Sequence, residues 1–122
     1  MDVTYEQANE KLVEALPELA EAYRKQVEWW GNEKPRQHVV YGLILNPYLD
    51  RLLQDSNEAD LRRVFAFLEH LSVNPDPHVQ ELVSFTVCEH LGGDLEKLRQ
   101  ARHYMGPATL KLSGEADKFW KG

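Results

Sequence analysis

The sequence has a single cysteine, Cys88, so the chain cannot form an internal disulfide. This scarcity suits a reducing compartment, and we expect a cytoplasmic protein. Long apolar runs are missing as well: the longest, residues 39–45, is far shorter than the ~18 residues that a membrane span requires. The N-terminus is acidic and polar, where a secretion signal would be basic and then apolar. We therefore expect no membrane association.

Motifs that carry chemistry are also missing. The pair Gly92–Gly93 lacks the Lys-Ser or Lys-Thr that completes a phosphate-binding loop. The dipeptides Glu69–His70 and Glu89–His90 do not place ligands three or four residues apart, as helical metal sites do. Cys88 lies in an apolar stretch, where thiols are usually unreactive. We predict no metal, no cofactor and no enzymatic activity.

Positive charge is in short supply, with 14 basic against 20 acidic side chains and a net charge of −6. This balance opposes binding to nucleic acid, which needs a concentrated positive field. It favours attraction to a basic protein partner, although mild acidity also serves solubility without any partner.

Apolar residues recur at helical spacing through most of the 122 residues, a length that suits one domain. We predict an all-α fold for residues 1–122: a compact bundle of about six to seven short helices, partly arranged as HEAT-like antiparallel hairpins. Residues 38–45 contain β-branched side chains, but no partner strand exists to satisfy an isolated strand.

Helix ends follow from local signals. Thr4 and Gln7 form a capping box, Ser56 or Asn57 caps a middle helix, and Asp94 caps another. Pro17 either kinks or breaks the first helical stretch, and we favour a break. Asn46–Pro47 is expected to reset the chain. Further ends are expected after Asn74, at Gly92–Gly93 and at Gly106–Pro107.

Trp29 interrupts the pattern of its own helix. Trp30 continues the apolar stripe, whereas Trp29 points about 100° away, towards the polar face. An exposed tryptophan is a frequent feature of protein-binding hot spots. Alternatively, the loop of residues 31–38 or the C-terminal Phe119–Trp120 segment covers it.

Glu89 and His90 interrupt a second helix. A helical wheel places Glu89 near Leu82 and Phe85, and His90 near Val83, so both side chains are expected at least partly inside. A buried carboxylate must be paired or hydrogen-bonded. Either Glu89 fixes the packing, through backbone groups or an arginine such as Arg62 or Arg63, or the two residues line a pocket for a small molecule.

Several segments resemble a family of small bacterial helical domains of unknown function. The resemblance rests on residues 63–69, 79–83, 89–94 and 104–109, which are packing and turn motifs, and it extends over roughly residues 10–120. Members resemble compact helical proteins encoded singly or beside secreted-toxin genes. The resemblance therefore implies an immunity protein that binds and blocks a cognate toxin, and it implies no catalytic residue.

The leading hypothesis is a non-catalytic protein-binding module, with toxin neutralisation as its most concrete form. The candidate contact residues are Trp29 and four acidic residues around the turn at 54–60: Asp50, Asp55, Glu58 and Asp60. Acidic turns are usually only solvated surface. The alternative is a small-molecule-binding or sensory domain with a pocket near Glu89 and His90, and an enzyme is the third choice.

Overall fold

A computed structural model describes residues 3–121, with side chains described up to Ala116. Within this range the chain forms seven continuous helices, some with a short 3-10 or π segment. In chain order the segments are η1 (Tyr5–Gln7), α1 (Ala8–Ala15), η2 (Pro17–Leu19), α2 (Ala20–Trp30), α3 (Gln37–Val40), η3 (Tyr41–Leu45), α4 (Asn46–Gln54), α5 (Glu58–Ser72), α6 (Pro77–Glu81), η4 (Leu82–Cys88), α7 (Glu89–Gly92), α8 (Leu95–Arg102) and α9 (Pro107–Lys121). The predicted all-α bundle is confirmed.

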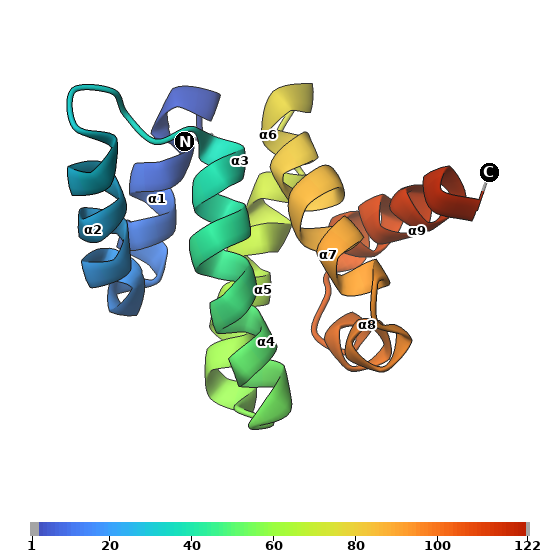
Figure 1. Cartoon of the computed structure of the whole chain (residues 1–122). Coiled ribbons are helices and arrows are strands. Elements are labelled where there is room, and N and C mark those ends of the chain that lie inside the picture. The colour runs from blue at the N-terminus through green and yellow to red at the C-terminus, as the bar shows by residue number, and fades with distance from the viewer. Residues whose placement is uncertain (1–2, 122) are drawn as a thin grey trace.

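Successive helices up to α7 run in alternating directions, as antiparallel hairpins do (Figure 1). Helices α1 and α2 form one edge of the molecule, and α8 and α9 lie at the opposite edge (Figure 1). None of the described helices combines the length and the hydropathy needed to cross a bilayer.

Two of the seven helices contain a π-helical segment, and these two segments pack against each other. His38 Nδ1 lies 2.6 Å from Thr86 Oγ1, and Asn46 Nδ2 donates a 3.3 Å hydrogen bond to the Thr86 carbonyl. Polar contacts from one helix therefore converge on a single residue of the other. Sequence periodicity did not predict either π segment.

The expected break at Pro17 is confirmed, and the expected reset at Asn46–Pro47 is wrong. Leu16 leaves the helical conformation at φ −128° and ψ 75°, so α1 ends before Pro17. By contrast, the helix that begins at Gln37 continues through Pro47 to Gln54. The π segment directly before Pro47 explains this continuity, because a widened turn accommodates the crowding that proline imposes on the preceding turn.

The buried apolar residues form a single cluster to which most of the helices contribute. Tyr41 of η3 is fully buried, and its hydroxyl donates a 2.8 Å hydrogen bond to the Ala8 carbonyl. Burial raises the pKa of Tyr41 well above its usual value. Helix α2 differs from its neighbours, since none of its eleven residues is buried.

Candidate functional site

The end of α2 carries the most exposed aromatic side chain among the described residues. Trp29 is 80% exposed, and its ring lies edge-on to that of Trp30, with 6.1 Å between centroids. Val27, two residues earlier, is also exposed. Trp29 therefore faces solvent, and the following loop, one of the two segments considered as a cover, does not cover it. Phe119 and Trp120 lie outside the described side chains, and α9 is at the other edge of the molecule (Figure 1).

The helix that carries Trp29 is anchored at its N-terminal start, in η2. Leu19 in η2 is buried in the core, and Glu18 beside it bridges to α4 and α5. Tyr23, one turn into α2, packs against the core while remaining half-buried. This helix is therefore anchored at η2, while its C-terminal end, with Trp29, is not covered by other parts of the described chain.

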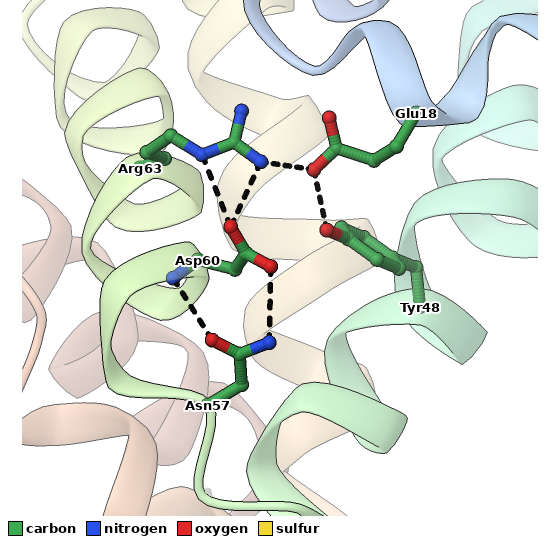
Figure 2. A network of polar contacts seen from close by, with 5 residues as sticks. All are labelled: Glu18, Tyr48, Asn57, Asp60 and Arg63. Atoms are coloured by element: carbon green, nitrogen blue, oxygen red, sulfur yellow. Dashed lines mark hydrogen bonds and ion pairs between the residues drawn. The ribbon is translucent and has the colours of Figure 1, made fainter.

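The acidic turn between α4 and α5 belongs to a polar network that Figure 2 shows in close view. Asn57 accepts a 3.3 Å hydrogen bond from the Asp60 backbone N–H and so caps α5. Asp60 accepts in turn from Arg63, at 3.0 and 3.2 Å. Arg63 also pairs with Glu18, which accepts a hydrogen bond from the Tyr48 hydroxyl (Figure 2). This network joins η2, α4 and α5.

Electrostatics in this network stabilise the ionised carboxylate of Glu18. Burial opposes ionisation of Glu18, but hydrogen bonds from Tyr48 and Arg63 outweigh it and lower the pKa of Glu18. Burial and the neighbouring Glu18 raise the pKa of Tyr48, so its hydroxyl stays a donor. These acidic groups therefore serve to hold the helices together.

The other acidic candidates are arranged in three different ways. Glu58 pairs with Arg62 at 2.6 Å, and Asp55 is exposed in the turn. Asp50 lies on α4, where His90 Nε2 approaches its carboxylate at 2.8 Å and Lys97 Nζ at 3.4 Å. Asp50 thus joins α4 to α7 and α8. Positive groups of the chain itself neutralise much of the acidic cluster.

Glu89 and His90 do not share a common site. Glu89 is half-buried, while His90 lies at the surface with 38% of its side chain exposed and pairs with Asp50. Arg62 and Arg63, the expected partners of Glu89, pair with other carboxylates. The expected inward position of His90 is therefore corrected to the surface.

The π segment η4 explains why the helical wheel misplaced His90. A π segment adds a residue relative to an α-helix, and each added residue turns the following side chains by about 100°. His90 comes directly after η4, so its side chain is rotated away from the face predicted from a regular helix. Phe85, within η4, is exposed for the same reason.

Cavities between the described residues lie elsewhere. Four of them have volumes from about 110 to about 420 Å³, and neither Glu89 nor His90 lines any of the four. Within the described part of the chain, no three His, Cys, Asp or Glu side chains are grouped so that they could hold a metal ion. A small-molecule pocket near Glu89 and His90 therefore stays a prediction that these four cavities do not support.

Comparison with known families gives one match, to a domain of unknown function, DUF7674, over residues 9–121. The chain belongs to this family. No curated protein matches the chain, and no solved structure matches it.

In this DUF7674 domain, two of the segments that carry the family resemblance, residues 63–69 and 104–109, meet at the start of α9. Glu69 of α5 accepts hydrogen bonds from the backbone N–H groups of Ala108, at 3.0 Å, and Thr109, at 2.9 Å. The Thr109 hydroxyl donates a third, at 2.8 Å. Burial opposes ionisation of Glu69, but these donors outweigh it and lower its pKa. Glu69 therefore caps a helix about 40 residues further along the chain.

Gly106 leaves room for this cap. A Cβ at Gly106 would lie 2.4 Å from the Glu69 carboxyl carbon, closer than real Cβ contacts allow. Sequence reasoning treated Gly106–Pro107 as a helix stop and missed the carboxylate. A signal existed, because α9 begins without a local acidic or Asx cap.

The five predicted contact residues do not form one surface. The C-terminal end of α2, with Trp29, lies at one end of the bundle, and the turn between α4 and α5 lies at the other (Figure 1). Of the acidic candidates, Asp60 belongs to the network of Figure 2, and Glu58 and Asp50 pair with other side chains of the chain. Among the candidates, the α2 end is the surface that combines exposure with a large apolar side chain.

Proposed function

We propose that this DUF7674 domain is a non-catalytic protein-binding module that contacts its partner through the C-terminal end of α2. The observation that carries the proposal is Trp29, 80% exposed on a helix that contributes no buried residue to the core. Tryptophan is the residue type most enriched at binding hot spots, and a fixed scaffold reduces the entropy lost on binding.

The charge of this edge selects a basic partner. From η1 to the end of α2, residues 5–30, the chain has six acidic against three basic side chains. The net charge of this stretch is therefore −3, half of the net charge of −6 of the whole protein. Such a field accelerates association with a positively charged partner and disfavours an acidic one.

The most concrete form of this function is an immunity protein in the cytoplasm that blocks a bacterial toxin with a basic active-site cleft. Support comes from the family resemblance and from the pairing of an exposed tryptophan with an acidic edge. Neutralisation by coverage requires a preformed surface and no reaction. The polar groups described above accordingly act in packing and capping.

The test is a calorimetric titration of the purified protein with a toxin-like protein that is encoded beside its gene. We expect Trp29→Ala to weaken binding by roughly 30-fold, since hot-spot truncation costs about 2 kcal/mol or more. Leu43→Ala is the matched control, because Leu43 is also exposed, on η3, and its loss should change affinity less than about twofold. Equal affinity of wild type and Trp29→Ala would refute the role of α2.

A further inference from the structure

Four polar side chains that have no hydrogen-bond partner among the described residues surround one hollow, where α8 packs against α4. This cavity, of about 110 Å³, lies between the turn after α4, the start of α5 and the end of α8. Buried Leu53 and Leu61 form its apolar wall. The polar side chains that line it are Ser56, Gln100, His103 and Tyr104. Three separate segments of the chain therefore build the site.

A second cavity, of about 290 Å³, shares His103 and Tyr104 with the first and extends along α5. Its further lining residues are Arg62, Phe65, Ala66, Glu69 and Gly106. We call the two cavities together the Tyr104 pocket. Arg62 already pairs with Glu58, the Glu69 carboxylate already accepts three hydrogen bonds, and the described lining of the first cavity has no charged acid or base. The described lining therefore offers no unpaired carboxylate, lysine or arginine, which favours an uncharged ligand.

The backbone of Ser56 gives a second, independent indication of a ligand. Its φ of 53° is the only left-handed value among the described residues other than glycine. Ser56 closes α4 in a Schellman motif, since the Asn57 N–H donates to the Leu52 carbonyl at 3.0 Å. Glycine is the usual residue in this position, and any other side chain costs free energy there. Serine in this place keeps a hydroxyl group in the lining of the cavity, and strained residues of this kind cluster at ligand sites.

The groups of the Tyr104 pocket suit a flat heterocycle with a polar edge. A hydroxyl, an amide, an imidazole and a phenol can each donate or accept, so the ligand must carry both donors and acceptors. The Gln100 amide presents its carbonyl and NH2 groups side by side, the arrangement that pairs with N6 and N7 of adenine. The apolar walls favour a ligand that also has an apolar face. The larger cavity is close to the lower limit of the sizes found for small-molecule sites.

We propose that the Tyr104 pocket binds a small uncharged purine, of which adenine and adenosine are the simplest, with Ser56 and Gln100 hydrogen-bonded to its edge. This inference goes beyond the proposed function and does not depend on it, because the α2 end contributes no residue to the described lining of the pocket. A free base or nucleoside fits better than a nucleic acid, since the net charge of −6 opposes a phosphate backbone.

Titration of the isotope-labelled full-length protein with adenosine, followed by NMR, tests the proposal. We expect the backbone N–H signals of residues 53–56, 61–66 and 100–106 to shift, with half-saturation below about 1 mM. Glucose has a polar edge without a flat aromatic face, and toluene has the face without the polar edge, so neither should cause these shifts. Adenosine monophosphate should bind no more tightly than adenosine, because the described lining has no unpaired arginine or lysine.

Two variants separate a role in binding from a role in folding. Ser56→Gly removes the hydroxyl and relieves the left-handed backbone, so we expect a higher melting temperature together with about two- to tenfold weaker binding of adenosine. Gln100→Ala should weaken binding about fivefold or more and should still fold, because Gln100 is exposed. Gln54→Ala is the matched control, since Gln54 is exposed on α4 and lies outside the described lining of both cavities. Its affinity should equal that of the wild type.

Three results would overturn the inference. They are unchanged signals at adenosine concentrations up to about 5 mM, equal affinity of Ser56→Gly, Gln100→Ala and Gln54→Ala, and tighter binding of glucose or adenosine monophosphate than of adenosine. The two proposals fail separately. Loss of adenosine binding from the account leaves the α2 surface untouched, and toxin binding that does not depend on Trp29 leaves the Tyr104 pocket untouched.

Discussion

The carboxylate of Glu69 gives the sharpest quantitative test of how the bundle is held together. Replacing Glu69 with alanine removes three hydrogen bonds at the start of α9, two of them to backbone N–H groups. A lost helix cap costs about 0.5–2 kcal/mol, and hydrogen bonds to a charged group are at the upper end of the usual scale. Because Glu69 is half-buried, we expect a total near 2 kcal/mol. For a domain of this size, that lowers the melting temperature by about 6–10 °C.

The substitutions Glu69→Ala and Gly106→Ala together make a double-mutant cycle that tests this estimate. In Gly106→Ala the new methyl group would occupy the space of the Glu69 carboxyl group, so the side chain must leave the N-terminus of α9. The two substitutions then remove the same interaction. We expect the double variant to be about as stable as either single variant, with a coupling of about 1–2 kcal/mol, measured by urea denaturation. Additive losses would refute the assignment of Glu69 as the cap.

Lowering the pH should destabilise the wild-type protein in the same way as Glu69→Ala does. The pKa of Glu69 is lowered in the folded protein, so its contribution to stability is fully present above the unfolded value near 4.3 and is lost as the pH falls through the folded pKa. Wild type and Glu69→Ala should therefore differ most at neutral pH and converge in acid. Melting temperatures between about pH 7 and pH 3 measure this difference, and a gap that stays constant would contradict the cap.

Substitutions at two further positions test the network of Figure 2. Tyr48→Phe removes the hydrogen bond to Glu18 and should cost about 0.5–1.5 kcal/mol in urea denaturation, and no loss would show that the hydroxyl is solvated equally well elsewhere. Asn57→Ala removes the cap of α5 and should cost about 1 kcal/mol, whereas Asn57→Ser should retain most of the stability, because a serine hydroxyl accepts from the same N–H. Equal losses in the two Asn57 variants would contradict capping.

Local sequence signals predicted the helix ends well, because the groups that make an end lie within a few residues of each other. Thr4 and Gln7 form the expected capping box, Asn57 caps α5, and Asp94 caps α8. The break at Pro17 follows from the same local chemistry. Each of these contacts joins residues at most three apart, so no knowledge of the tertiary structure was needed.

The π segments and the Glu69 cap could not be predicted in this way. A π turn depends on how two helices pack, here on contacts such as His38 with Thr86, which are 48 residues apart. Once a helix contains a π turn, positions after it no longer follow the 3.6-residue period. This explains the error at His90. The helix from Pro17 to Trp30 contains no π segment, so the helical wheel places Trp29 correctly on the polar face.

The internal pairing of the acidic turn decides which surface is left for a partner. A partner that approached Asp60 would have to compete with Arg63, and one that approached Glu58 would have to displace Arg62. Exposed ion pairs contribute little to stability, but breaking several at once leaves the helix junction without its cross-links. The end of α2 has no such penalty, since Trp29 already faces solvent and its burial against a partner removes apolar area from water. Binding at α2 therefore leaves the contacts that hold the bundle together intact.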